Sequence, residues 1–208
     1  MKPMDPIQTL MDEHLVILEA LSALDTYTDR LAAGEAPSSD LGDFVEFIRK
    51  FADGLHHRKE EDMLFSRMVE NGFPRQGGPI AVMLMEHDEG RRLTRAMAAL
   101  TQKQGLLDAE ELRGLNAAAR GYTALLRQHI YKEDNVLYPM AKMHLPAAVM
   151  SALGEEFEKF EAGVASERHR LLAIASRLVE AYPVTAEAET DGHACVCGGH
   201  ATFAGAGK

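Results

Sequence analysis

The chain has 208 residues, of which 46% are hydrophobic, so it is long enough and apolar enough to bury a core. Its 32 acidic residues outnumber the 22 basic ones, and the net charge of −10 should repel nucleic acid and anionic lipid, so we expect neither as a partner. No apolar run approaches the roughly 20 residues that span a bilayer, and the first residues lack the apolar stretch of a secretory signal, so we expect a cytoplasmic protein that does not enter a membrane.

The first half of the chain predicts two long helices. Helix-favouring residues dominate, and the alternation typical of strands is nearly absent. Asp5 followed by Pro6 predicts the start of the first helix, and Gly34 predicts its end. Ser38 or Ser39 should cap a second helix that runs to about residue 70, where the breaker-rich segment NGFPRQGGP begins.

The second half predicts two more long helices. The third should cover about residues 80–103. Asp108 should cap the fourth, which runs to about residue 142, with Pro139 bending or closing its end. Short connections between four such helices are typical of an antiparallel bundle.

A further helical region should open at Pro146, and we expect Gly154 to interrupt it before a long amphipathic stretch. The fold class that we predict is all-α. Residues 1–145 would form an up-down-up-down four-helix bundle, and residues 146–183 a C-terminal helical extension that packs on it.

The last segment, residues 184–208, is expected to be a flexible tail. It contains HACVCGGH, an HxCxCxxH pattern with Cys195 and Cys197 one residue apart. Such a pair could bind a thiophilic metal or cycle as a thiol pair, but a single C-x-C is a weak signal.

An internal repeat organises the bundle. The segment LHHRKEEDMLFSRM aligns with RQHIYKEDNVLYPM at an offset of 73 residues, and the same offset aligns MDEHL with LMEHD. Chance seldom matches four histidines and two glutamates under one offset. The matching positions are His14 with His87, His56 with His129 and Glu60 with Glu133.

The repeat also selects a register in the first copy, which has two adjacent histidines. His56 with Glu60 and His57 with Glu61 are both spaced four residues apart, so one metal ion could touch either pair. The second copy has only one histidine, four residues before Glu133, which selects His56 with Glu60. We interpret His57 and Glu61 either as an adjacent, partly exposed pair or as residues behind the ligands, whose side chains hydrogen-bond to the metal ligands and orient them.

Six such side chains at one level of a bundle predict a metal centre. Burying these polar side chains without ions would cost much free energy of folding. A pair of cations offsets that cost, because imidazole and carboxylate then act as metal ligands. Nitrogen and carboxylate donors without thiolate suit iron or manganese, with zinc as an alternative. Two imidazoles, two bridging carboxylates and one solvent-derived bridge give about five ligands per ion, which leaves one position for dioxygen, peroxide or nitric oxide.

This ordered set resembles the hemerythrin family, in its bacterial HHE cation-binding branch, over roughly residues 5–145. The resemblance implies a four-helix bundle around two non-haem iron ions with an oxo or hydroxo bridge, and we favour iron over manganese or zinc. It also implies that Glu60 and Glu133 bridge the ions. The expected metal ligands are therefore His14, His56, Glu60, His87, His129 and Glu133.

Two positions bear on how closely the chain follows the oxygen carriers of that family. Arg91 stands one turn after His87, where the carriers have a second histidine, and this argues against reversible oxygen carriage. Arg91 should either steady an anionic ligand or pair with Asp88 or a neighbouring helix. Asp134 has the spacing of the aspartate that the carriers use, so it remains the alternative to Glu133.

The set of four histidines and two glutamates looks more like the di-iron proteins of the iron-centre repair type. We therefore expect a protein that binds or reacts with dioxygen, nitric oxide or peroxide, in oxidative or nitrosative stress or in iron handling. The alternatives are a non-catalytic sensor, an iron store or donor, and a structural di-metal protein. The expected partner is a small molecule, and the chain is expected to be a monomer or a homodimer.

Overall fold

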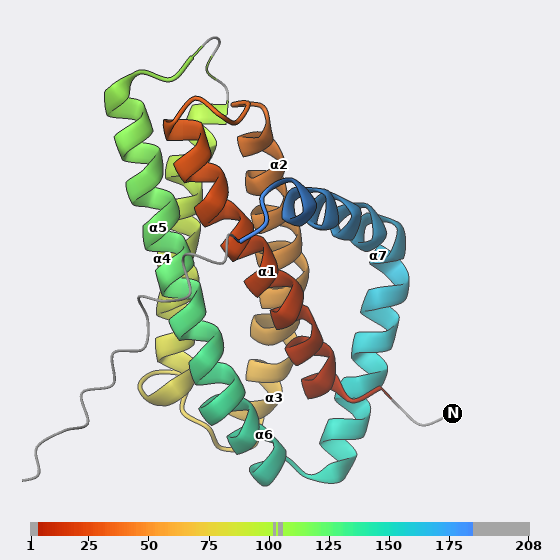
Figure 1. The fold of residues 1–208 in the computed structure, drawn as a ribbon. Helices are drawn as coiled ribbons and strands as arrows, with labels where there is room; N and C mark the ends of the chain where they lie inside the picture. Colours follow the sequence, from red (N-terminus) through yellow and green to blue (C-terminus); the bar gives the residue numbers. More distant parts are fainter. Residues whose placement is uncertain (1–3, 102, 104–105, 185–208) are drawn as a thin grey trace, which may run out of the picture.

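The computed structural model describes residues 4–101, 103 and 106–184, and every regular element in these ranges is helical (Figure 1). This confirms the all-α bundle with an extra C-terminal helix. The cysteine-bearing tail lies outside the described residues. The elements in chain order are α1 (Pro6–Ala32), α2 (Asp40–Phe47), the π-helical η1 (Ile48–His57) and η2 (Lys59–Leu64), α3 (Phe65–Glu70), α4 (Gly78–Thr101), α5 (Ala109–Lys132), the π-helical η3 (Glu133–Leu137), α6 (Tyr138–His144) and α7 (Ala147–Ala181).

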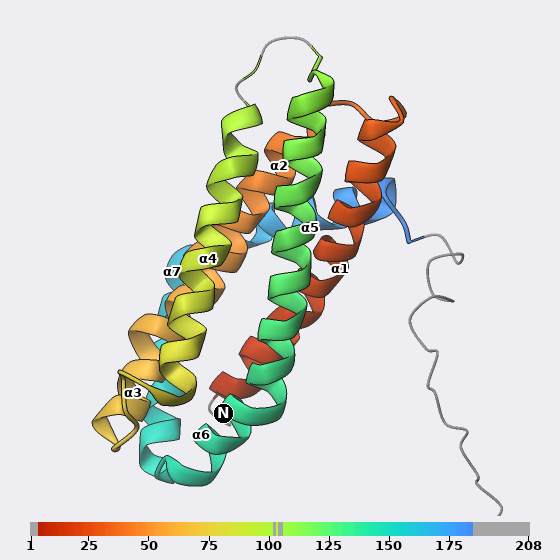
Figure 2. The same ribbon diagram turned by 90° about the vertical axis from the view of Figure 1, so that its left-hand side faces the viewer.

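The bundle consists of four helical rods (Figure 2). They are α1, the run from α2 to α3, α4, and the run from α5 to α6. The second rod runs without a break from α2 through η1 and η2 into α3, because its boundary residues, such as Arg58 and Phe65, keep helical backbone angles. The fourth rod likewise joins α5, η3 and α6. Helix α4 packs against α5 and α2, and α1 packs against α5 and α7.

Two predicted helix starts are confirmed by their caps. The Asp5 side chain accepts hydrogen bonds from the backbone N–H groups of Ile7 and Gln8. Asp108 forms a capping box with Glu111, in which each side chain accepts from the other residue's backbone N–H. Ser39 precedes α2 but makes no capping hydrogen bond.

Pro139 does not close the fourth rod, and Gly154 does not interrupt α7. The fourth rod continues past Pro139 to His144, because Pro139 lies in the first turn of α6, just after the π-helical turn. Helix α7 runs unbroken through Gly154, so the predicted interruption there is wrong. A Cβ atom at Gly154 would lie 2.4 Å from the backbone oxygen of Met4, so this glycine admits the N-terminal segment against α7.

Helix α7 covers one side of the bundle. In Figure 1 it first runs alongside the bundle and then crosses over α1 and α2. Near its end, the Tyr182 ring packs against Tyr27 and Phe44, at centroid distances of 5.1 Å and 5.9 Å. Within the described residues, no helix is both long enough and apolar enough to cross a membrane.

The buried apolar side chains form two separate clusters along the bundle. One includes Ile17 and Phe44, and the other includes Leu10 and Phe65. On α1, His14 lies between Leu10 and Ile17, and the other repeat histidines lie between the two clusters in the same way. The fold therefore holds a layer of buried polar side chains between two apolar clusters.

Candidate metal centre

All six residues expected as metal ligands lie in this polar layer, and each is at most 1% exposed. They come from all four rods of the bundle. Their donor atoms belong to two groups. Within each group, all donor atoms lie within 4.8 Å of one another. The first group is His14, His56, Glu60 and Glu133, and the second is His57, Glu60, His87 and His129.

The four repeat histidines face each other in two pairs. The Nε2 atoms of His14 and His56 lie 3.0 Å apart, and those of His87 and His129 are also 3.0 Å apart. Between the pairs lie the carboxylates of Glu60 and Glu133. Glu133 Oε2 is 3.3 Å from Nε2 of both His14 and His129, and Glu60 Oε2 is 3.5 Å from His87 Nε2.

Each of these histidines turns its other nitrogen toward a carboxylate. Repeat-related histidines have similar Nδ1 distances to their carboxylates. The distance is 3.0 Å from His56 to Glu13 and 2.9 Å from His129 to Glu86. It is 2.8 Å from His14 to Asp134 and 2.7 Å from His87 to Glu61. An ionised carboxylate only accepts, so Nδ1 carries a proton, and Nε2 of a neutral imidazole can then offer its lone pair to the centre. This is the usual arrangement behind metal-ligating histidines.

The residues present therefore fit a pair of cations. Two Nε2 lone pairs that face each other at 3.0 Å repel unless a proton, as in an N–H···N hydrogen bond, or a metal ion lies between them. Among the residues that the structure describes, no hydrogen-bond donor meets the buried oxygens Glu60 Oε2, Glu133 Oε1 and Glu133 Oε2. A cation beside each pair of imidazoles would satisfy both sets of atoms.

The ionisation of the cluster without ions follows the same logic. Burial raises the pKa of Glu60 well above its usual value, and the nearby Glu133 carboxylate raises it further. Burial lowers the pKa of His129, but Glu133 and Glu86 outweigh that effect and raise it to about 9. Protons thus supply part of the positive charge that metal ions would bring.

Two residues behind the histidines were not predicted. Glu13 and Glu86 each precede a repeat histidine in sequence, and the alignment of MDEHL with LMEHD was the only signal of their shared role. A lysine then pairs with each of them, Lys59 with Glu13 and Lys132 with Glu86. Lys59 is fully buried and also pairs with Glu161 of α7, which ties α7 to this half of the centre.

The helical turns that carry the two glutamates are widened. The N–H of Phe65 donates to the carbonyl of Glu60, and the N–H of Tyr138 donates to that of Glu133, in each case five residues back. Such π-helical turns are rare and occur most often at functional sites. Nothing in the sequence distinguishes them from ordinary α-helix.

The repeat is broken where Phe65 aligns with Tyr138. The Tyr138 hydroxyl donates to Glu60 Oε1 at 2.6 Å and lies 3.4 Å from His14 Nε2. Phe65 offers no polar atom at the equivalent place, so the two halves of the centre have different surroundings.

His57 and Glu61 were interpreted as a partly exposed pair or as partners behind the ligands. His57 is buried, so the exposed alternative is wrong for it. Glu61 is partly exposed and also hydrogen-bonds to the His87 ring from behind. Arg91 pairs with Asp53, Glu61 and Asp88, so it takes the ion-pair role that was one of its two expected roles.

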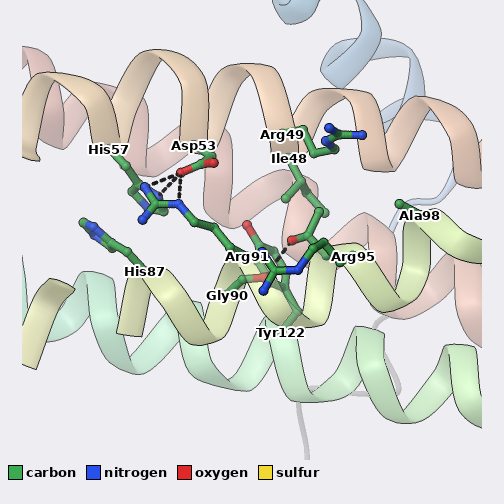
Figure 3. A pocket seen from close by; sticks show the side chains of 11 residues that line it. Ile48, Arg49, Asp53, His57, His87, Gly90, Arg91, Arg95, Ala98 and Tyr122 are labelled. Atoms are coloured by element: carbon green, nitrogen blue, oxygen red, sulfur yellow. Dashed lines mark hydrogen bonds and ion pairs between the residues drawn. The ribbon is translucent and has the colours of Figure 1, made fainter. Parts of the chain in front are cut away.

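A cavity of about 270 Å³ adjoins the second group of donors (Figure 3). His57 and His87 lie at one end of it, and Arg91 and Asp53 lie beside them. Tyr122 and Gly90 line its wall, and Arg49 and Arg95 lie farther along it. The cavity is large enough for a small molecule to approach the layer of histidines.

Comparison with known proteins agrees with this geometry. The family model of the hemerythrin HHE cation binding domain matches residues 5–141. The chain belongs to this family. The match includes all six expected ligand positions and ends before α7.

Two kinds of curated relatives are similar to this hemerythrin-family chain. An uncharacterized protein of Mycobacterium tuberculosis is 26% identical over 160 residues, which cover 76% of this chain and 62% of that protein. The iron-sulfur cluster repair protein YtfE of Salmonella newport is 38% identical over 136 residues, which cover 62% of this chain and 60% of that protein. The chain thus spans less than two thirds of the length of these relatives. No solved structure matches it significantly.

Proposed function

We propose that this hemerythrin-family protein holds two iron ions and binds or reacts with dioxygen, nitric oxide or peroxide. Residues 1–145 would form the metal-holding bundle and residues 146–183 its helical extension, working in the cytoplasm. The proposed ligands are His14, His56, Glu60, His87, His129 and Glu133. The observation that carries the proposal is the convergence of four Nε2 lone pairs, each fixed by a carboxylate on Nδ1, around two buried glutamates.

The donor set supports iron. Imidazole and carboxylate without thiolate suit iron or manganese better than softer metals. A bound di-iron pair would supply redox chemistry and an electrophilic position for a small ligand. The chain's own part is to hold the two imidazole pairs in one tautomer, to place two carboxylates between them and to keep bulk water out of the layer.

The name of the YtfE relative supports a second candidate, in which the centre stores or donates iron for iron-sulfur cluster repair. Measuring turnover distinguishes a reactive centre from a centre that stores or donates iron. A reactive centre should consume peroxide or nitric oxide in stopped-flow mixing, with many molecules consumed per chain, whereas a store should release iron without turnover. A structural di-metal centre should do neither.

The first experiment is elemental analysis of protein expressed in iron-replete cells, with optical spectra before and after the addition of azide or nitric oxide. We expect two iron ions per chain and a spectrum that changes with either ligand. His87→Ala should lower the metal content sharply, whereas His144→Ala, which changes an exposed histidine, should not. Two ions per chain in His87→Ala would show that the ligand set is wrong.

A further inference from the structure

The cavity of Figure 3 breaks the internal repeat. Gly90 and Thr94 line it on α4, and the offset of 73 residues aligns them with Ile17 and Leu21 on α1. Both of these counterparts are buried in the apolar core. Since the matching half of the bundle fills these positions with large apolar side chains, neither the helical rods nor the layer of histidines requires open space here.

The lining residues lead away from the histidine layer. On α4 they follow at intervals of four residues, from His87 through Arg91 to Arg95, so they share one face of the helix. This stripe covers about two turns, or about 12 Å along the helix axis. Arg49 of η1 lies on the opposite wall, also at the end away from the histidines (Figure 3).

Two arginines at that end carry positive charge without a counter-ion. Among the residues that the structure describes, neither Arg49 nor Arg95 makes an ion pair or a side-chain hydrogen bond. Asp53 is the one carboxylate among the residues that line the cavity, and it is already paired with Arg91. Counter-ions are plentiful in a chain with 32 acidic and 22 basic residues. The free guanidinium groups therefore make this end of the cavity attractive to an anion.

A buried hydroxyl faces the same space. Tyr122 of α5 is only 2% exposed and lines the cavity (Figure 3). Its hydroxyl makes no hydrogen bond with any described residue, which is costly for a buried polar group unless something binds it. Burial and the nearby Asp53 carboxylate raise the pKa of Tyr122, so the hydroxyl stays protonated and can donate to an anion.

We propose that this cavity is a binding site for a small organic carboxylate. Arg49, Arg95 and Tyr122 supply hydrogen-bond donors for the carboxylate group, since the planar fork of arginine matches its two oxygens. Ile48 and the Tyr122 ring supply apolar surface for the carbon chain. The volume of about 270 Å³ is at the lower end for ligand pockets, so the ligand is small. This site is separate from the metal centre and does not require that the layer of histidines hold iron.

Isothermal titration calorimetry of the iron-loaded, full-length chain tests the ligand class with acetate, hexanoate and inorganic phosphate. Hexanoate should bind at least about tenfold tighter than acetate, because each buried methylene group tightens binding about fourfold. It should also bind tighter than phosphate, which has the charge but no carbon chain. Equal affinities for hexanoate and acetate, or phosphate binding as tight as that of hexanoate, would overturn the proposal of an organic ligand.

A pair of arginine variants tests the charged end of the site. Arg95→Gln should weaken the binding of hexanoate about tenfold, since it removes a charged donor. Arg113→Gln is the matched control, because Arg113 is also exposed and unpaired among the described residues but does not line the cavity. Its affinity for hexanoate should equal that of the wild type. Unchanged affinity in Arg95→Gln, or an equal loss in Arg113→Gln, would show that the anion binds elsewhere.

A third variant tests the space for the carbon chain. Thr94→Leu copies the repeat counterpart Leu21 and fills part of the cavity without changing any charge. It should weaken the binding of hexanoate at least about tenfold and leave that of acetate nearly unchanged, because the chain loses its buried place. Hexanoate that binds Thr94→Leu as tightly as the wild type would mean that the ligand stays on the surface, and the proposal would fail.

Discussion

The Nε2 atoms of His14 and His56 face each other across 3.0 Å, although the two residues lie 42 positions apart in the sequence. His87 and His129 repeat this relationship with the same distance and the same separation. The duplicated halves thus build two matched half-sites whose buried lone pairs converge. The repeat also provides an internal control, because many changes in one half have a counterpart in the other.

The fourth rod offers two adjacent carboxylates, and their positions predict different effects. Glu133 Oε2 lies 3.3 Å from two Nε2 atoms, whereas Asp134 accepts a hydrogen bond from Nδ1 of His14. Glu133→Ala should bind less iron, since it removes an oxygen that faces an imidazole of each pair. Asp134→Asn should keep two ions but bind them about 10–100-fold more weakly, the usual effect of changing a partner behind a ligand. Chelator competition measures both. Retained iron in Glu133→Ala with loss in Asp134→Asn would make Asp134 the ligand.

The buried Lys59 and its repeat counterpart Lys132 should differ in their contribution to stability. Lys59 is fully buried between Glu13 and Glu161. Lys59→Met removes the ammonium group beside the buried Glu13, which among the described residues then keeps only its contacts with His56 and Arg168, and should lower the free energy of unfolding by about 3–5 kcal/mol. Lys132 is 36% exposed, and Lys132→Met should cost about 0–1 kcal/mol. Urea unfolding of the metal-free proteins gives both values. Equal losses would mean that the contact with α7 adds no stability.

Glu61 should make stability depend on pH in the acid range. Burial raises its pKa, but the His87 hydrogen bond and Arg91 outweigh burial and lower it to about 2, from a usual value of 4.5. The ionised carboxylate therefore stabilises the fold above about pH 4.5, and this contribution is lost as the pH falls toward 2. We expect Glu61→Gln to cost about 1–2 kcal/mol at pH 6, after a discount for partial exposure, and much less near pH 3.

The measurement for Glu61 is urea unfolding of metal-free protein at several pH values. Glu89→Gln is a suitable control, because Glu89 also pairs with an arginine, Arg92, but on the exposed face of α4. Its effect should be small at every pH, since solvent screens the pair. A cost of Glu61→Gln that stayed constant down to pH 3 would contradict the assigned pKa.

Two glycines of α7 should respond in opposite ways to alanine. A Cβ at Gly154 would lie 2.4 Å from the backbone oxygen of Met4, so Gly154→Ala must displace the N-terminal segment and should cost about 1–3 kcal/mol. Beyond the backbone of its own helix, no atom of the described residues lies within 4 Å of a Cβ added at Gly163, so Gly163→Ala should stabilise the helix by up to about 1 kcal/mol. Thermal unfolding distinguishes the two. A neutral Gly154→Ala would mean that the N-terminal segment does not pack tightly on α7.

The sequence by itself determined the helical rods and which six side chains to examine. Asp5 and Asp108 marked helix starts because capping is a local interaction between a side chain and the next turn. The offset of 73 residues selected His56 over His57 because duplicated halves repeat their functional positions. Both kinds of information lie within short segments or in the comparison of two segments.

Only the tertiary structure decided what surrounds those side chains. It brought Glu13 to His56 and Asp134 to His14, contacts that join residues 43 and 120 positions apart. It also buried His57, which no repeat partner had marked. These results depend on how far apart the rods pack and how each is rotated. A helical pattern in the sequence gives the face of one rod, but the distance between two atoms on different rods is set by the packing of the whole bundle.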